Sequence, residues 1–325
     1  MVLLLTQADL RPLAELSSEL DGAFAAIQEA FLEHQRGEAK LYAGTELPLT
    51  GEQRSLRVLP SASPANGAGV RFNPLVGRLD NPDSFVNLLF DGANGQLLAL
   101  IAGDDLNVVR TATPAGLAAR YLAPEGARTM GMLGSGRQAR GQVIAVKHAL
   151  PRLERVRVFS PTPAHRAAFA EEMTRRLGVP VEAVDEPRRA VEGADVVGVT
   201  SNAREPVLQA EWVRAGALIL SMSAGQLPPE VVLRSRVIVS SMPEVVEVRR
   251  EPYRSLIADG RWGADRVAAT MAEVIEGGTP GRTSQSETVL YEMPGMSIWD
   301  TAIMRWAYRW ALANELGSTF HLSSP

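Results

Sequence analysis

The stretch 129-TMGMLGSGRQARG-141 decides the fold of this chain. Its apolar start, Thr129–Leu133, predicts a short buried strand, and Arg137–Ala149 predict the helix that follows. The turn between them is rich in glycine. Gly134 permits a tight turn, and Gly136 lets the backbone approach a ligand without a side chain in the way. Taken alone, the stretch is compatible with a nucleotide phosphate site or with a simple strand-to-helix turn.

The region after this turn favours the phosphate site. Short apolar strands and helices alternate there, which is the pattern of a parallel α/β sheet. In such a sheet, a glycine turn after the first strand places free N–H groups and the positive end of a helix against a dinucleotide pyrophosphate. The predicted strands are Arg155–Phe159, Val181–Val184, Asp195–Thr200, Ala217–Met222 and Val237–Ser240.

The predicted dinucleotide site includes residues of the glycine turn and of two later strand ends. The second strand ends without the acid that grips the ribose of NAD; it ends instead in hydroxyl groups and an arginine that suit the 2′-phosphate of NADP(H). NAD(H) remains the alternative, with Arg166 then only a solvated helix residue. The candidate cofactor residues are Gly134, Ser135, Gly136, Arg137, Gln138, Ser160, Thr162, Arg166, Thr200, Ser201 and Asn202.

The first hundred residues follow a different pattern. An amphipathic helix is predicted at Ala23–Arg36. Four strands follow, which favours an antiparallel or mixed sheet. Thr113 and Pro114 predict the start of a helix, and Asp265–Glu276 predict another. The chain closes with Glu287–Glu292 and a helix predicted from Ile298 to about Leu316. The predicted strands are Ser55–Leu59, Gly69–Phe72, Phe85–Phe90 and Gln96–Ala102.

The bulk composition excludes several classes of function. The 325 residues carry a net charge of −4, so no basic field attracts nucleic acid or anionic lipid. There is no cysteine, and the four histidines have no metal-ligand spacing, so we expect no metal site. The start, MVLLLTQADL, is apolar for four residues only and lacks a basic leader. We therefore expect a cytoplasmic protein that spans no membrane.

Four segments resemble, in order, those of the ornithine cyclodeaminase/mu-crystallin family. They are VVRTATPAGLAARYLAP (Val108–Pro124), GMLGSGRQARGQ (Gly131–Gln142), ADVVGVTSNAREPVL (Ala194–Leu208) and GMSIWDTAIMRWAYRWA (Gly295–Ala311). The resemblance implies an α/β fold in which a Rossmann NAD(P)-binding domain is inserted between two segments of an α+β substrate and dimerisation domain. It implies the boundaries 1–124, 125–286 and 287–325, a homodimer, and an amino-acid or imino-acid substrate.

The same resemblance implies roles for single residues. Arg110 and Thr111 match the family's Arg-Thr pair, of which the arginine binds substrate carboxylate and the threonine helps with cofactor phosphate. Arg71 stands where the family usually has a substrate-contacting lysine; since arginine keeps its proton, Arg71 suits anion binding better than acid–base chemistry. Asp300 occupies the acid position of the closing helix. Asp300, Asp104 and water are the candidate proton donors, and Asp300 and Arg71 the candidate catalytic residues.

Two departures from the family pattern bear on the activity. The family's early substrate arginine lines up with Gly44, where only Lys40 could replace it. The acid that cyclodeaminases carry after strand five is missing from SMSAGQLPPEVVL, where Gly225 and Gln226 stand instead. We therefore expect an NAD(P)H-dependent oxidoreductase that reduces the imine of a 2-oxo acid or oxidises an amino acid. A lyase with catalytic NAD and a non-catalytic NADPH-dependent binding protein are the alternatives.

Overall fold

The computed structural model covers residues 1–325 and describes residues 1–15, 19–42, 44–49, 54–76, 85–222, 225–242 and 251–322. The chain divides into two units, each with its own sheet. Unit 1 comprises Met1–Arg110 and Met296–Pro325, and unit 2 comprises Thr111–Gly295. The boundary between them falls inside one helix, α3 (Gly103–Leu122).

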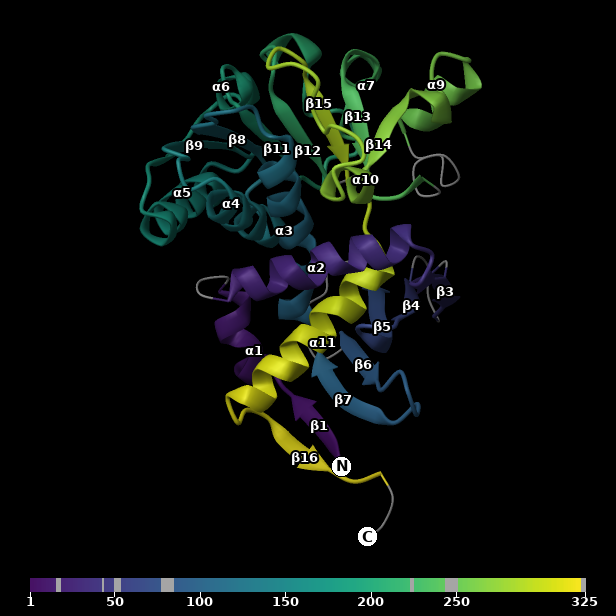
Figure 1. Ribbon diagram of the computed structural model, residues 1–325. Coiled ribbons are helices and arrows are strands. Elements are labelled where there is room, and N and C mark those ends of the chain that lie inside the picture. Colours follow the sequence, from purple (N-terminus) through teal and green to yellow (C-terminus); the bar gives the residue numbers. More distant parts are fainter. Residues whose placement is uncertain are drawn as a thin grey trace. The chain divides into compact units, whose positions relative to one another are not determined.

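Unit 2 is built on an all-parallel sheet whose order is β10-β9-β8-β11-β12-β15-β13-β14 in the described residues (Figure 1). Its strands are β8 (Thr129–Leu133), β9 (Arg155–Phe159), β10 (Val181–Ala183), β11 (Val196–Val199), β12 (Leu218–Ser221), β13 (Arg236–Val239), β14 (Val267–Thr270) and β15 (Val289–Glu292). The helices are α4 (Arg137–Ala149), α5 (Pro163–Leu177), α6 (Pro187–Val191), α7 (Pro229–Arg234), α9 (Tyr253–Ala258) and α10 (Met271–Ile275), with 3₁₀ turns at Ala210–Trp212 and Ala264–Arg266.

The strand order places the glycine turn at a functional position of the sheet. From β8 the chain continues to one side through β9 and β10, and it then returns to β11 on the other side of β8. Ligands of open parallel sheets bind outside the carboxyl ends of the strands at such a reversal point. The predicted parallel sheet is thus confirmed, and β8, β9 and α4 have the bounds that the sequence predicts.

Two predictions in the last part of unit 2 are wrong. We expected Glu287–Glu292 to belong with the closing helix, but β15 lies between β12 and β13 in the parallel sheet. A helix expected over 265–276 is replaced by β14 and the short α10, which begins at the capping box of Thr270 and Glu273. β14 pairs in parallel with β13 at the edge of the sheet, and this tertiary pairing overrides the local helix propensity.

Unit 1 holds a mixed sheet of order β16-β1-β7-β6-β5-β4-β2, with β3 also paired to β4. Its strands are β1 (Val2–Leu5), β2 (Lys40–Leu41), β3 (Thr45–Pro48), β4 (Arg54–Ser63), β5 (Gly67–Val76), β6 (Val86–Phe90), β7 (Leu97–Ala102) and β16 (Ser318–Phe320). The helices are α1 (Gln7–Ala14), α2 (Leu20–Gln35) and α11 (Ser297–Ala313). β1 pairs in parallel with β7, and the other pairs are antiparallel.

Helix α11 returns from the end of the chain to cover one face of this sheet. It packs on β4, β5 and β6 and lies beside α2 (Figure 1). The edge of the Trp299 indole meets the Phe31 ring, with centroids 5.5 Å apart. Gly69 lets the helix approach closely, because a Cβ at this position would lie 2.3 Å from Thr301 Oγ1. This packing fixes the next residue along the helix, Asp300, against the sheet.

The two faces of the sheet differ in burial. Along β4, β5, β6 and β7, the positions that face α11 are mostly buried, whereas the alternate positions are half-buried and apolar. This second face consists of Leu56, Val58, Pro60, Val70, Phe72, Val86, Leu88, Phe90, Leu98 and Leu100. We call it the aliphatic face of unit 1.

Helix α3 differs from the sequence prediction. Thr113 and Pro114 were expected to begin a helix, but the structure has one helix that starts at Gly103 and runs through Pro114. Proline costs one backbone hydrogen bond inside a helix. Its neighbours Ala112 and Ala115 are fully buried, and we attribute the continuity of α3 to this packing. Among the described residues, no helix has the length and apolarity needed to span a bilayer.

Candidate functional site

Gly134 is required by the fold of unit 2. Its φ is +121°, a conformation that side chains disfavour. A Cβ at this position would lie 1.9 Å from the carbonyl oxygen of Thr200, where the chain leaves β11. The Gly134 N–H donates to the carbonyl of Phe159 at 2.8 Å. The glycine therefore lets the ends of β8, β9 and β11 meet.

Gly136 has no such structural requirement. Its φ is −78°, and a Cβ there would have no heavy atom within 4 Å among the described residues. It is the N-cap of α4 and, as a glycine, has no side chain that could cap the helix. The first turn of α4 therefore presents N–H groups and a positive dipole end to exposed space. The space beside Gly136 can accept a bulky anion.

The end of β9 is tied to the glycine turn by hydroxyl groups. Ser135 Oγ donates to Ser160 Oγ at 2.8 Å, and Ser160 is buried. Arg166 donates from Nη1 to the Ser160 carbonyl at 2.9 Å, and its guanidinium carbon lies 5.9 Å from the centroid of the Phe159 ring. Thr162 is exposed. The structure thus brings Ser135, Ser160 and Arg166 together, with Thr162 at the start of α5.

The loop after β11 is held by two glutamines. Thr200 Oγ1 donates to the buried Gln142 Oε1 at 2.8 Å. Gln226, also buried, accepts from the Ser201 N–H at 3.2 Å and donates to the Ser201 carbonyl. Asn202 is exposed at the tip of this loop. Gln226 lies after β12, the fifth strand of unit 2 in chain order, where the sequence has no acid. The sequence did not reveal that Gln226 holds this loop.

Unit 1 contains a buried cluster of two arginines and one aspartate, contributed by three separate elements. Arg71 on β5 donates from Nη1 to Asp300 Oδ1 at 2.8 Å. Arg110 on α3 places Nε 3.3 Å from the same oxygen. The Arg71 and Asp300 side chains are 6% and 5% exposed, and that of Arg110 is 14% exposed. One carboxylate thus serves two largely buried guanidinium groups.

Neighbouring side chains orient the two arginines. Asn107 Oδ1 accepts from Arg110 Nε at 2.9 Å and from Nη2 at 2.6 Å. The Arg71 guanidinium carbon lies 5.1 Å from the centroid of the Phe85 ring. Among the described residues, the buried Nε of Arg71 has no hydrogen-bond partner. Arg71 therefore keeps one donor for a further acceptor.

The cluster carries a net positive charge. Burial is the main reason that the pKa of the Arg110 guanidinium falls to about 10; the positive charges of Arg71 and Arg57 also lower this pKa, and the negative charge of Asp300 raises it. At neutral pH Arg110 still holds its proton, so Arg71, Arg110 and Asp300 sum to one positive charge. An anion bound beside Arg110 would offset the free-energy cost of burying this positive charge.

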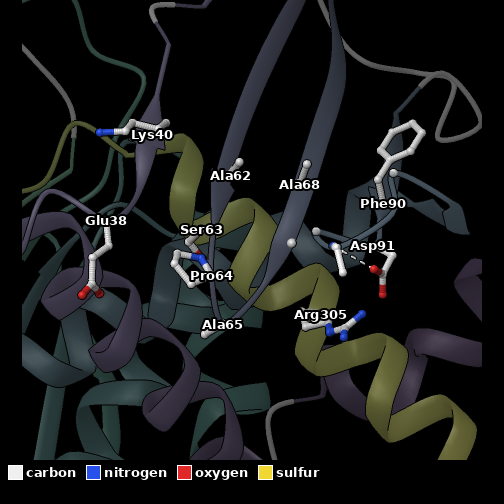
Figure 2. A pocket seen from close by; sticks show the side chains of 14 residues that line it. Glu38, Lys40, Ala62, Ser63, Pro64, Ala65, Ala68, Phe90, Asp91 and Arg305 are labelled. Atoms are coloured by element: carbon white, nitrogen blue, oxygen red, sulfur yellow. Dashed lines mark hydrogen bonds between the residues drawn. The ribbon is translucent and has the colours of Figure 1, made fainter.

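The cavity within the cluster is small. It is lined by Arg71, Phe85, Asn87, Arg110 and Asp300 among others, and its volume is about 10 Å³, room for about one water molecule. A much larger groove, of about 810 Å³, lies elsewhere in unit 1 (Figure 2). It is lined by Ser63, Asp91, Lys40 and Arg305 among others, and it does not include the arginine cluster.

The sequence left Lys40 as the only side chain that could reach round to replace the early substrate arginine at Gly44. Its Nζ donates instead to the carbonyl of Gly37 at 2.9 Å, and its side chain lines the large groove (Figure 2). Arg57, which no sequence motif singled out, lies close enough to Arg110 to lower the pKa of that guanidinium. The alternation of β4 could have identified it, because Arg57 and Leu59 share the face that meets Arg71.

Among the described residues, no group of three or more His, Cys, Asp or Glu side chains is arranged to hold a metal ion. Thr111 is buried in α3 next to Arg110 along the chain, on the unit 2 side of the boundary.

We predict that the two turn glycines respond differently to substitution. Gly134→Ala should lower the free energy of unfolding by at least about 2 kcal/mol, because the methyl group meets a carbonyl oxygen and the residue keeps a positive φ. Gly136→Ala should lower it by less than about 1 kcal/mol. Urea denaturation followed by far-UV circular dichroism measures both. Equal losses in the two variants would contradict the geometry of the turn.

Comparisons with known proteins place the chain in one family. Delta(1)-pyrroline-2-carboxylate reductase of Bacillus cereus is 26% identical over 284 residues, 84% of this chain and 86% of that enzyme. The structure of the Thermococcus litoralis enzyme of that name, in complex with NADH and L-proline, is 28% identical with a TM-score of 0.88, covering 98% of this chain and 100% of that one. An archaeal alanine dehydrogenase dimer with bound NAD is 26% identical with a TM-score of 0.86, covering 99% of each chain. The model of the ornithine cyclodeaminase/mu-crystallin family matches residues 6–315, and the chain belongs to that family.

Proposed function

We propose that this protein is a nicotinamide-dependent oxidoreductase that reduces the imine of a 2-oxo acid to an amino acid. The carrying observation is the buried cluster of Arg71, Arg110 and Asp300, whose net positive charge matches one carboxylate. The named relatives, two pyrroline-2-carboxylate reductases and an alanine dehydrogenase, act on amino or imino acids, which agrees with such a substrate. The reverse reaction, oxidation of an amino acid, uses the same groups.

The glycine turn fits the pyrophosphate of a dinucleotide. Gly136 has open space in place of a Cβ and begins a helix of 13 residues, so backbone N–H groups of the helix N-terminus can donate to phosphate oxygens. We assign phosphate contacts to the segment Gly134–Gln138, which includes Ser135 and Arg137, and to Thr111. We place Thr200, Ser201 and Asn202 along the cofactor crevice, with Gln142 and Gln226 holding that loop in position.

The substrate end of the reaction depends on the arginine cluster. Arg110 and Arg71 each present a planar fork of donors that pairs with a carboxylate in a bidentate manner. When bound, a reduced nicotinamide supplies a hydride to the imine carbon; the nitrogen takes one proton, and the cofactor leaves oxidised. Asp300 is held by both guanidinium groups, which favours a positioning role for it over that of proton donor.

The loop after β12, the fifth strand of unit 2 in chain order, argues against the lyase alternative. A cyclodeaminase uses an acid there, whereas Gln226 binds the backbone of Ser201 and cannot act as a base. Arg71 also stands in place of a lysine, and a guanidinium group is not a suitable base. We therefore favour the reductase over ornithine cyclisation.

We predict that the purified protein turns over imines with NADPH. Purified protein should oxidise NADPH when supplied with cyclic ketimines, or with 2-oxo acids mixed with ammonia or methylamine. Arg110→Gln should raise KM for the imine roughly ten- to a hundredfold, the size of a lost charged hydrogen bond, and Arg110→Lys should restore part of the loss. Arg152→Gln, at an exposed arginine, is the matched control. Ammonia release from ornithine without net NADH formation would instead support the lyase.

We further propose that NADP(H) is the preferred cofactor. The residue at the end of β9 is Ser160, and Arg166 lies beside it, so a cation is at hand and the ribose-binding acid of NAD enzymes is not found at that position. Ser160→Asp should lower kcat/KM for NADPH by roughly a hundredfold, through repulsion of the 2′-phosphate, and raise it for NADH. Steady-state kinetics with both cofactors measures this. An unchanged ratio of the two values would contradict the proposed preference.

We also propose that two copies associate through the aliphatic face of unit 1. This face offers a continuous row of half-buried apolar side chains on four neighbouring strands, and monomers rarely expose such a patch. The archaeal alanine dehydrogenase relative is a dimer. We therefore propose that a second copy of this chain covers the aliphatic face.

A charge on the aliphatic face should separate the copies. The wild-type protein should sediment at about 70 kDa, twice the 35.0 kDa of the chain, and Leu88→Asp at the single-chain mass. Gln96→Asp, at an exposed turn position, is the control and should keep the larger mass. Analytical ultracentrifugation at several concentrations measures the mass. A Leu88→Asp protein that remains folded at the larger mass would exclude this face as the interface.

A further inference from the structure

We propose that the large groove of unit 1 binds a free α-amino acid, with the carboxylate at Arg305 and the ammonium group at Asp91. The groove has a volume of about 810 Å³, and its lining does not include the arginine cluster. It is therefore a second ligand site in unit 1, and the inference does not depend on the proposed imine reduction.

Arg305, on α11, lines the groove as a cation without a counter-charge (Figure 2). Its Nε is buried and has no hydrogen-bond partner among the described residues. Its guanidinium carbon lies 5.8 Å from the centroid of the Tyr308 ring, and this aromatic contact uses none of the N–H donors. A half-buried polar group without an acceptor is costly, so a carboxylate at this position would be stabilising.

Asp91, in the turn after β6, contributes the opposite charge (Figure 2). Its Oδ1 accepts from the Ala93 N–H at 2.9 Å and from the Asn94 N–H at 3.3 Å, which fixes the side chain in an Asx turn. In the part of the chain that the structure describes, Asp91 forms no ion pair, and its Oδ2 keeps its capacity to accept. An ammonium group is a suitable donor for this oxygen.

The other two charged side chains of the groove are exposed. Glu38 pairs with Arg36 at 2.8 Å, and Lys40 donates to a backbone carbonyl. The half-buried charges are thus those of Arg305 and Asp91, which do not pair with each other. A single ion would satisfy one of them only, whereas a zwitterion carries a partner for both.

The remaining wall of the groove accepts an apolar side chain. Ala62, Ala68 and Phe90 line it, and its volume is much larger than the backbone of one amino acid needs. Ligand pockets commonly combine such an apolar wall with a few polar groups that fix orientation. Phe90 is also a member of the aliphatic face, so the groove adjoins one end of that face. The preferred ligand is therefore an amino acid with an apolar or aromatic side chain.

The walls of the groove are held in place by packing and hydrogen bonds. A Cβ at Gly67 would lie 2.4 Å from the carbonyl oxygen of Phe90, so the tip of the β4–β5 hairpin packs directly on the end of β6. The buried Glu33 of α2 accepts from the Ala65 N–H at 2.8 Å and from the Asn66 amide at 3.1 Å, which fixes the same tip. A site that is formed in advance loses little conformational entropy when a ligand binds.

The test titrates three related molecules into the purified protein by calorimetry. L-Phenylalanine carries both charges, 3-phenylpropionate lacks the ammonium group, and 2-phenylethylamine lacks the carboxylate. L-Phenylalanine should bind at least about tenfold more tightly than either of the others. Arg305→Gln and Asp91→Asn should each weaken its binding roughly ten- to a hundredfold. The asparagine keeps the oxygen of the Asx turn, and Arg309→Gln, at an exposed arginine of the same helix, is the control.

A further variant separates the groove from the arginine cluster. Arg110→Gln removes a carboxylate partner at the cluster and should change the affinity for L-phenylalanine less than about twofold. Binding that Arg110→Gln abolishes and Arg305→Gln leaves intact would assign the amino acid to the cluster and overturn the inference. Equal affinities for the three molecules, or no detectable binding of L-phenylalanine, would overturn it as well. Imine turnover is measured separately, so its absence would overturn the reductase and leave the groove site standing.

Discussion

One oxygen atom, Asp300 Oδ1, is the constraint on which the architecture of unit 1 depends. It accepts from Arg71 and lies 3.3 Å from Arg110, so it couples a strand from the first third of the chain, a helix that follows it, and the closing helix. Removing charges from water is costly, and loss of one partner leaves another charge buried without compensation. The packing of α11, with Trp299 against Phe31 and Thr301 against Gly69, keeps this oxygen in place.

In unit 2 the important positions are two glycines, and the lack of a side chain has a different consequence at each. Gly134 is a glycine because the strand ends crowd it, whereas Gly136 stands in open space. The difference matters for function. The fold alone explains why Gly134 is a glycine, so this residue says little about a ligand. Neither backbone conformation nor packing requires a glycine at Gly136, which indicates that a ligand approaches the backbone there. The family relatives with bound NADH or NAD agree with a dinucleotide as that ligand.

The sequence predicted the parts of this protein that depend on local pattern. The glycine turn and its flanking strand and helix, β9, and the strands of unit 1 from β4 to β7 followed from periodicity and turn chemistry. Pro114 was read as a helix start, but α3 continues through it, with buried alanines on either side. The position of β15 between β12 and β13 depends on pairing with strands distant in sequence, which a local pattern does not contain.

The residues of the candidate site also fall into two groups, those that the sequence indicated and those that depend on tertiary contacts. Resemblance to the family led to Arg71, Arg110 and Asp300, which the structure brings together, although their roles stay proposals. The clamp of Gln226 on Ser201 and the position of Arg57 depend on tertiary contacts and strand register, and both were missed. Sequence distance alone could not decide whether Lys40 reaches round to the position of Gly44, and its Nζ donates to the Gly37 carbonyl.

We propose above all that this chain delivers a hydride to the imine carbon of an α-imino acid. The most direct measurement is isotope transfer from NADPH carrying deuterium at the reactive nicotinamide carbon, with mass spectrometry and NMR of the amino-acid product. We expect one deuterium per product molecule, located on the α-carbon, with equal amounts of oxidised cofactor and product. Product without deuterium from either face of the labelled cofactor, or cofactor that binds while no imine is reduced, would contradict it.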